Sequence, residues 1–444
     1  MRKWLWKYGV PLVCSILLAG CGSPENQVAA GPESRGESSP NAAERTENRG
    51  ESSSDAAERT ENRDESSPDA AEIAESRDES STAGAEVTNA ETEAQEEGTD
   101  PAGTPGEPSE TADLPEPAEP QPSFDFEFTI CFAGDINLDE NSATTLFMDS
   151  QENGIYDCIS PELIEYMNNA DIMCLNNEFT YSTGGAPLEG KAYTFRAAPE
   201  RVEVLHQLGV DAVTLANNHV YDYGKEALLD TFATLEAAEI PYFGAGRNLE
   251  QAMSPLYIEV DGKTVAFVGA SRAEKYKMTP QATETEPGIL RCYDTSAYRE
   301  AIAEAKANAD FCIAFVHWGT EYSYDLEQVQ LDTGKEYLDA GADAVIGAHS
   351  HCLQGLEYYD GKPVIYSLGN YWFNKKTLDT MLVQLHFSGN EEGSSLQVEI
   401  IPAVQSGCRT TYAAEEEERR RIFDFLESIS VNVEITDQGI VCPF

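Results

Sequence analysis

Polar residues follow directly after several predicted strands, and this regularity limits both the fold of the chain and the place of its functional site. Five short apolar segments each end in one or two residues with carboxylate, amide or imidazole side chains. In open α/β sheets, ligand sites lie at the carboxyl ends of the strands, where several strands direct side chains into one crevice. Four of the six histidines occupy such positions, whereas we expect His206, on a predicted helix, and His386, in a late strand, to be structural. The clustered residues are Asp135, Glu178, Asn218, His219, His317, His349 and His351.

Strands and helices alternate through the same region, which predicts a fold of the α/β class with mixed sheets covered by helices. Pro161, after Ser160, marks the first turn of one helix. Asp-Gly pairs at 261–262 and 360–361 predict two hairpin turns. The expected strands cover residues 126–132, 171–175, 211–215, 256–260, 264–269, 311–316, 344–346 and 364–366. Further helices are expected over residues 199–209, 224–237, 298–308, 328–340 and 413–428.

Residues 1–21 have the pattern of a lipoprotein signal peptide. Basic residues at positions 2, 3 and 7 precede an apolar stretch over residues 10–20, which has signal-peptide rather than membrane-spanning length. The sequence Leu18-Ala19-Gly20-Cys21 resembles the bacterial lipobox, in which the cysteine is lipidated and becomes the new N-terminus. An ordinary secretory signal with a chance cysteine is the alternative. We expect lipidated Cys21 to anchor an extracytoplasmic protein to the cell membrane.

Residues 22–123 are predicted to be a disordered acidic tether. They contain 27 acidic and six basic residues, few residues of Val, Ile or Leu, and no aromatic residue. Such a segment buries too little apolar surface to offset its ordering entropy. A 14-residue repeat over 35–81 lacks an apolar stripe, and the Pro-rich end favours an extended spacer. We expect the remainder to comprise a domain over residues 124–405 and a C-terminal helix and tail over 406–444 that pack on it.

Composition excludes two classes of protein. The formal net charge is −50, and because phosphate contacts need a basic face, we expect no nucleic-acid partner. No second apolar run approaches 18 residues, which excludes a polytopic membrane protein. The cysteines that follow Cys21 form no Cys-x-x-Cys motif, which argues against a structural zinc site. The sequence leaves their pairing open, and we expect Cys131, Cys174 and Cys312 to be buried within strands.

The clustered ligand types predict a metal centre. Oxygen and imidazole ligands without thiolates suit divalent Mn, Fe, Zn or Mg. Their number suits two divalent ions bridged by a carboxylate, a pair that clamps an anionic substrate and lowers the pKa of a bridging water. An unligated histidine would then protonate the leaving group.

Seven motifs show a resemblance to one protein family. They are Phe132-Ala133-Gly134-Asp135, Asn176-Asn177-Glu178, Thr194-Phe195-Arg196-Ala197, Leu215-Ala216-Asn217-Asn218-His219 with Asp222-Tyr223-Gly224, His317-Trp318-Gly319-x-Glu321-Tyr322, Gly347-x-His349-x-His351 and Tyr366-Ser367-Leu368-Gly369-Asn370. Over residues 126–405 the chain resembles the CapA family of capsule and poly-γ-glutamate biosynthesis proteins. The resemblance implies a calcineurin-like metallophosphoesterase fold, a four-layer α/β sandwich of mixed sheets flanked by helices.

The resemblance also implies roles for individual residues. His219 corresponds to the catalytic histidine, with Asp222 as the acid beside it, and Glu178 corresponds to the bridging carboxylate. The implied metal ligands are Asp135, Glu178, Asn218, His317, His349 and His351. The candidate substrate-binding residues are Arg196, Asn217, Glu321 and Asn370. The guanidinium of Arg196 could bind a carboxylate or phosphate of the substrate through two parallel hydrogen bonds. The alternative is that Arg196 forms only a surface ion pair.

Three departures from the metallophosphoesterase pattern affect the metal centre. Asn137 stands where the usual first motif has His, Glu178 replaces the usual Asp, and Asp222 follows His219 at three residues' distance. These departures predict weak binding at the first metal position, or a different ion there.

Three functions remain compatible with these residues. The first is a metal-dependent hydrolase or transferase that processes an anionic capsular polymer such as poly-γ-glutamate, or attaches it to the envelope, alongside capsule-synthesis proteins. The second is a metallophosphoesterase acting on a small or cell-envelope phosphoester. The third is a non-catalytic polymer-binding scaffold. Residues 124–444 hold 52 acidic and 20 basic residues, so a polyanion needs the metal ions, or a local basic patch, to approach the domain. The candidates for that patch are Lys191, Arg196, Arg272, Lys275 and Lys277.

Overall fold

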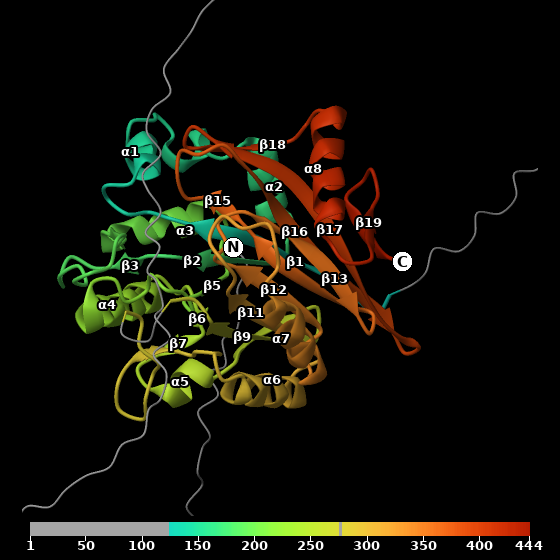
Figure 1. Cartoon of the computed structure of the whole chain (residues 1–444), viewed down its shortest axis with the longest axis horizontal. Helices are drawn as coiled ribbons and strands as arrows, with labels where there is room; N and C mark the ends of the chain where they lie inside the picture. The colour runs from blue at the N-terminus through green and yellow to red at the C-terminus, as the bar shows by residue number, and fades with distance from the viewer. Residues whose placement is uncertain (1–123, 275–277) are drawn as a thin grey trace, which may run out of the picture. The chain divides into compact units, whose positions relative to one another are not determined.

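The computed structural model describes residues 124–274 and 278–444, which contain two large β-sheets (Figure 1). The signal peptide, Cys21, the acidic tether, Lys275 and Lys277 lie outside the described residues. No helix within the described ranges is long and apolar enough to cross a membrane.

The larger sheet has ten strands, with a parallel part and an antiparallel part. Its parallel part runs through β1 (Phe126–Ile136), β2 (Ile172–Asn177), β5 (Ala212–Thr214) and β6 (Tyr242–Phe243). β1 also pairs antiparallel with β16 (Leu378–Asn390), which forms a long hairpin with β17 (Gly393–Ser406). The remaining strands are β15 (Asn370–Trp372), β18 (Arg409–Tyr412), β19 (Val433–Ile435) and β20 (Ile440–Pro443).

The smaller sheet has six strands in the order β13-β14-β12-β11-β9-β8. β9, β11, β12 and β14 are parallel, whereas β8 and β13 close hairpins at the two edges. The strands are β8 (Leu256–Val260), β9 (Lys263–Ser271), β11 (Phe311–His317), β12 (Ala344–Ala348), β13 (Leu353–Tyr359) and β14 (Lys362–Leu368). Two small pairs are β3 (Thr180–Tyr181) with β4 (Arg196–Ala197), and β7 (Ala245–Gly246) with β10 (Gly288–Ile289).

Alternating side chains divide the interior into three cores. Phe132 of β1 packs against Phe267 and Phe315 of the smaller sheet, with both ring-centroid distances at 6.4 Å, so one core lies between the sheets. The neighbouring residue Ala133 faces the opposite way, into a core that the larger sheet forms with its helices. A third core lies between the smaller sheet and its helices. This arrangement is the four-layer α/β sandwich that the resemblance implies.

Each outer layer consists of helices. Against the larger sheet pack α1 (Ala143–Asp149), α2 (Pro161–Asn169), α3 (Glu203–Gln207) and α4 (Gly224–Ala237). Against the smaller sheet pack α5 (Leu249–Met253), α6 (Ser296–Asn308) and α7 (Gln328–Asp339). The last helix, α8 (Glu416–Ser428), contributes Ile422, Phe423 and Leu426 to the core between the sheets.

Three local features differ from the sequence-based expectations. The segment 199–209 is not one helix, since a 3-10 turn (Pro199–Val202) precedes α3. Ser160 occupies the N-cap of α2, but its hydroxyl accepts a hydrogen bond from the backbone of Tyr412 instead of capping the helix. The long hairpin of β16 and β17 was not predicted, although His386 does lie in a late strand.

The described cysteines are all free thiols. Cys131, Cys174 and Cys312 are completely buried, as predicted. Burial raises the pKa of the Cys131 thiol to about 12, so this group behaves as a small apolar side chain.

Candidate metal centre

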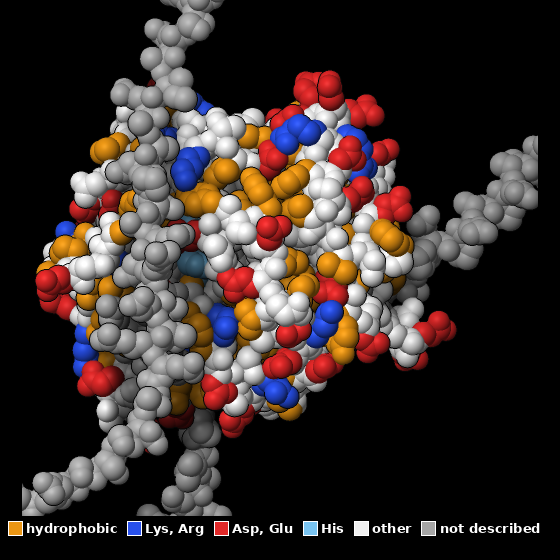
Figure 2. Space-filling model, viewed as in Figure 1, with side chains coloured by type: hydrophobic (Ala, Val, Ile, Leu, Met, Phe, Trp, Pro, Cys, Tyr) orange, Lys and Arg blue, Asp and Glu red, His pale blue; other side chains and the backbone are white. Residues whose placement is uncertain are grey.

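The predicted ligand residues meet where the carboxyl ends of strands from both sheets come together. Asp135 lies on β1 and Glu178 directly after β2, both in the larger sheet. His317 ends β11, and His349 and His351 follow β12, in the smaller sheet. The side chains of all five are almost completely buried. In Figure 2, histidine atoms are visible on one face of the domain, beside hydrophobic side chains.

Two potential ligand groups share one carboxylate. Glu178, His317 and His349 offer ligand atoms that lie within 4.8 Å of one another, and so do Asp135, Glu178 and His351. A carboxylate common to two groups is the arrangement expected of a bridging ligand. Glu178, the carboxylate common to both groups, is the residue for which the resemblance implies a bridging role.

The electrostatics of this cluster fit a bound cation. Asp135 Oδ2 and Glu178 Oε1 are buried and have no hydrogen-bond partner among the described residues. Burial, together with the neighbouring Asp135 carboxylate, raises the pKa of Glu178 well above its ordinary value. Buried charges of this kind are costly unless they are paired or coordinate a metal ion. Because a divalent cation would compensate both carboxylates, the residues present fit such an ion.

His317 and His349 are suited to ligation because burial favours their neutral form. Burial lowers the pKa of His317 well below its ordinary value, and His351, His219 and Lys191 lower it further. Burial likewise lowers the pKa of His349. Although His317 Nε2 lies 3.4 Å from Glu178 Oε1, a neutral imidazole forms no ion pair with that carboxylate. A neutral ring nitrogen retains the lone pair that a metal ion needs.

Asn218 belongs to the same cluster. Its Oδ1 lies 2.7 Å from His317 Nε2, and His349 Nδ1 lies 3.0 Å from that same nitrogen. Glu178 Oε1 lies 3.4 Å from the same His317 nitrogen. The fold thus places Asn218 beside the other candidate ligands.

The loop after β12 holds its two histidines in unusual backbone conformations. His349 has φ = 98° and His351 has φ = 55°. Positive φ is uncommon for residues other than glycine, and it occurs most often where the surroundings impose it at functional sites. The loop thus directs two imidazoles, separated by one residue, toward Asp135 and His317.

His219 and Asp222 form a separate pair beside the ligand cluster. Asp222 Oδ2 lies 2.7 Å from His219 Nδ1 and also accepts a hydrogen bond of 2.7 Å from the backbone N–H of Phe195. A carboxylate only accepts hydrogen bonds, so it directs the proton of His219 to Nδ1. His219 Nε2 is then the atom that can exchange a proton with a bound molecule.

Lys191 was expected to belong to a local basic patch, but in the structure it is paired with two carboxylates. Its ammonium lies 2.7 Å from Asp222 Oδ1 and 2.9 Å from Glu274 Oε2, and its side chain is only 5% exposed. It also donates to the backbone carbonyl of Asn218. Lys191 therefore neutralises Asp222 and supports the Asn218–His219 loop. The spacing along the chain gave no indication of this contact.

The four candidate substrate-binding residues have different surroundings in the structure. Asn370 is buried, and its Oδ1 lies 2.8 Å from His351 Nδ1, so it contacts one of the candidate ligands. Asn217 is also buried and donates to Asn176 Oδ1 at 3.0 Å, so its amide supports the loop. Glu321 is exposed, and its charge helps to raise the pKa of Glu178.

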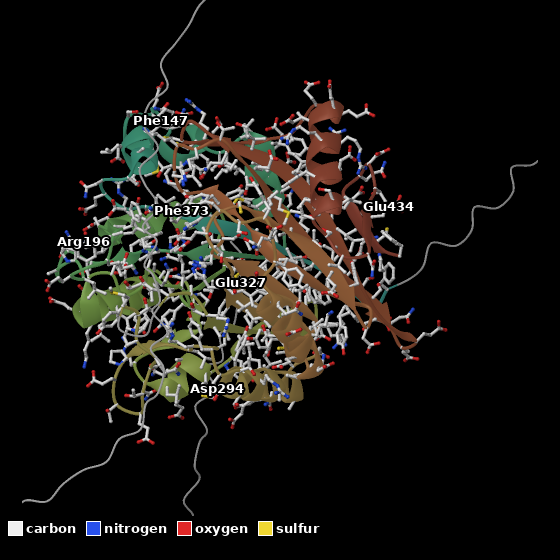
Figure 3. All side chains as sticks on the ribbon, in the orientation of Figure 1. Phe147, Arg196, Asp294, Glu327, Phe373 and Glu434 are labelled. Carbon is white, nitrogen blue, oxygen red and sulfur yellow. The ribbon has the colours of Figure 1, made fainter. Side chains whose placement is uncertain are left out.

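Arg196 lies apart from the ligand cluster. Its guanidinium is 4.3 Å above the ring of Tyr223, and Nη1 donates to the carbonyl of Gly184 at 3.0 Å. Figure 3 labels Arg196 near the edge of the domain in this view, whereas Phe373 lies nearer the centre. Neither a contact between Arg196 and the ligands nor a surface ion pair occurs in the described part of the chain.

Sequence reasoning assigned no role to Asn176, which connects the ligands. Its Nδ2 donates to Asp135 Oδ1 at 2.7 Å and lies 3.3 Å from His317 Nδ1, joining the two sheets. Its Oδ1 accepts a hydrogen bond from Asn217. Its position two residues before Glu178, at the end of a buried strand, was the available signal.

Comparison with known proteins identifies a family model that matches residues 129–375. That model describes a "Bacterial capsule synthesis protein PGA_cap". A "PGA biosynthesis protein CapA" of Bacillus subtilis is 34% identical over 198 residues, which make up 44% of this chain and 51% of that protein. A "Capsule biosynthesis protein CapA" of Bacillus anthracis is 33% identical over 219 residues, or 48% of this chain and 52% of that protein. The chain thus spans about half the length of the curated relatives it matches.

Solved structures show weaker similarity. A hypothetical protein from Thermus thermophilus has a TM-score of 0.36 at 16% identity, covering 61% of this chain and 99% of that chain. Zinc-complexed Vps29 from Entamoeba histolytica has a TM-score of 0.25 at 9% identity, covering 61% of this chain and 98% of that chain.

Proposed function

The chain belongs to the PGA_cap family of bacterial capsule synthesis proteins, and on that premise we propose that it is a metal-dependent enzyme of the cell surface. Its substrate would be an anionic capsular polymer such as poly-γ-glutamate, which it would hydrolyse or transfer to the envelope. Lipidated Cys21 would anchor it to the membrane, and residues 22–123 would hold the folded part away from that membrane. The names of its Bacillus relatives, which refer to PGA and capsule biosynthesis, support the choice of polymer.

One observation carries the enzymatic part of the proposal. Two potential ligand groups share Glu178 and lie beside a histidine, His219, that belongs to neither group. Asp135, Glu178, His317, His349 and His351 would hold two divalent ions, with Asn218 as a further ligand. Ions bound there supply positive charge that polarises a carbonyl or phosphoryl oxygen of the substrate.

The protein's own residues would control one proton. Asp222 holds the imidazole of His219 in a single tautomer, and Lys191 and the backbone of Phe195 hold Asp222. Asn217 Oδ1 accepts from the backbone N–H of His219 at 3.0 Å, which fixes the loop that carries the ring. His219 Nε2, which carries no proton in this tautomer, would take a proton from the attacking nucleophile and pass it to the leaving group, while Asp222 stabilises the charged imidazolium in between. A general acid of this type contributes about 10²- to 10⁴-fold to the rate.

Metal content and polymer length together test the proposal. The full-length protein, supplied with Mn, Fe, Zn or Mg, is expected to bind about two equivalents of metal ion, a stoichiometry set by the shared-carboxylate arrangement. Glu178→Gln and His349→Ala should lose most of this metal, while His206→Ala, which changes an exposed histidine on α3, should keep it.

Catalysis is tested separately from binding. His219→Ala should retain the metal but shorten or transfer poly-γ-glutamate at least about 100-fold more slowly than the wild type. A wild-type protein that takes up none of the four metals, or that leaves the polymer unchanged while hydrolysing simple phosphoesters, would contradict the proposal. In the second case the phosphoesterase function would replace it.

A further inference from the structure

Three aromatic side chains pack against two histidines of the site, His219 and His351. The ring of Phe195 lies 4.3 Å from His219, and Phe373 lies 4.5 Å from His351. Phe195 and Phe373 also contact each other edge-on, with ring centroids 5.5 Å apart. The ring of Tyr322 also contacts His351, with ring centroids 5.6 Å apart. We refer to Phe195, Phe373 and Tyr322 as the aromatic wall.

A lysine lies at the outer end of this aromatic wall. The ammonium of Lys376 is 3.4 Å above the centre of the Tyr322 ring, which makes a close cation–π contact. Lys376 is exposed, and Tyr322 is 40% exposed. A continuous set of contacts therefore runs from the buried ligand His351, through Tyr322, to a positive charge in solvent.

The local backbone holds this lysine in place. Asn374 Oδ1 accepts a hydrogen bond of 2.9 Å from the backbone N–H of Lys376. The buried side chain of Gln405 donates to the carbonyl of Lys376 at 3.2 Å and accepts from the backbone N–H of Phe373 at 2.8 Å. One buried amide thus fixes both Phe373 of the aromatic wall and the turn that carries Lys376.

Tyr322 is fixed from its own side. Its backbone N–H donates to the carbonyl of Ser350 at 2.6 Å, within the loop that carries His349 and His351. Its φ of 58° is uncommon for a residue with a side chain. Strain of this kind persists where the surrounding structure imposes it, most often at functional sites.

The charge of Lys376 is available to a ligand. No described carboxylate lies within ion-pair distance of its ammonium, whereas Lys191 is paired with Asp222 and Glu274. Residues 124–444 are strongly acidic, with 52 acidic and 20 basic residues. An anion that approaches the ligand cluster therefore needs a local positive charge at the entrance.

We propose that Tyr322 and Lys376 form a carboxylate-binding subsite at the entrance to the metal centre. This inference rests on the proposed function, because it assigns the subsite to a polymer that carries a carboxylate on every residue. One carboxylate pairs with Lys376 while the neighbouring part of the chain lies along the aromatic wall toward His219 and His351. The contact selects polyanions over uncharged polymers and sets their direction of entry.

Lys375 provides a matched control for the test. It is the adjacent residue, carries the same charge and is also exposed, but it makes no contact with the Tyr322 ring among the described residues. Binding of fluorescently labelled poly-γ-glutamate to the full-length protein is measured by anisotropy, with dextran as an uncharged competitor. Lys376→Gln is expected to raise Kd about 3- to 10-fold, as for the loss of one ordinary hydrogen-bonded contact. Lys375→Gln should change Kd less than about 2-fold, a shift typical of a general loss of charge at an exposed position.

A second pair of variants tests the ring. Tyr322→Phe keeps the aromatic face and should bind like the wild type, whereas Tyr322→Leu should weaken binding to about the same extent as Lys376→Gln. Equal effects of Lys375→Gln and Lys376→Gln, or a wild type that does not bind the polymer, would overturn the subsite. Metal content is measured on every variant and should stay at the wild-type value.

The outcomes separate the subsite from the proposed enzyme activity. A wild type that binds the polymer through Lys376 but leaves its length and attachment unchanged supports the subsite and contradicts processing. Conversely, polymer cleavage that proceeds with the same KM in Lys376→Gln and the wild type supports processing and overturns the subsite.

Discussion

Replacing Lys191 with methionine tests whether the buried ion pair beside His219 stabilises the protein. The ammonium lies 2.7 Å from Asp222 Oδ1 and 2.9 Å from Glu274 Oε2. The side chain of Asp222 is fully buried, and that of Glu274 is 22% exposed. Lys191→Met keeps most of the aliphatic length and removes only the charged end, so the change leaves Asp222 without its cation.

The expected loss follows from these distances and from burial. At an effective dielectric constant of about 20, two unit charges this close attract each other by about 6 kcal/mol. Desolvation of the charged groups cancels much of this attraction, and removing one partner of a buried pair typically costs about 3–5 kcal/mol. Water can reach Glu274 after the substitution, but it cannot reach Asp222 without local opening. We therefore expect the free energy of unfolding to fall by about 3 kcal/mol, the lower end of that range.

Urea denaturation of the full-length protein, followed by tryptophan fluorescence, measures this loss. Lys225→Met is the matched control, because Lys225 Nζ lies 2.5 Å from Glu286 Oε2 with both side chains about half exposed, at 49% and 59%. Exposed pairs contribute about 0–1 kcal/mol, so this variant should unfold almost as the wild type does. If Lys191→Met lost no more stability than Lys225→Met, the structural role assigned to Lys191 would be refuted.

Further predictions concern close packing, thiol burial and lipidation. The added methyl group in Gly134→Ala would overlap the backbone carbonyl of Gly369, so the free energy of unfolding should fall by about 1–3 kcal/mol and the variant should bind less metal. An unchanged Tm would contradict this. Burial raises the pKa of Cys131 to about 12, so iodoacetamide at pH 8 should modify the partly exposed Cys442 well before Cys131. Peptide mass spectrometry measures the two rates, and equal rates would show that Cys131 is accessible. Cys21→Ser should move the protein from the detergent phase to the aqueous phase on phase partitioning, and a variant that stays with detergent would show that lipidated Cys21 is not the anchor.

The sequence was sufficient to identify the family and the α/β class. Seven motifs in order indicated CapA proteins, and the match over residues 129–375 confirms that resemblance. α4 and β8 have the predicted bounds, because strong turn signals flank them and their apolar periodicity is regular. The last helix was predicted over residues 413–428, but α8 begins only at Glu416. The backbone N–H of Ala413 instead donates to the carbonyl of Pro402, a contact that local signals do not indicate.

Only the tertiary structure determined which polar residues share a site and which do not. Asp135 and His351 are far apart in the chain, yet their side chains lie 3.3 Å apart because the carboxyl ends of two different sheets meet there. Lys191 was expected at the surface, but the fold buries it against Asp222. Lys376 follows no predicted strand and belongs to none of the seven motifs, and its contact with Tyr322 depends on a turn held by Gln405. A local pattern in the sequence indicates whether a residue lies at the end of a strand. The direction and the partner of its side chain depend on contacts between segments that are distant in sequence.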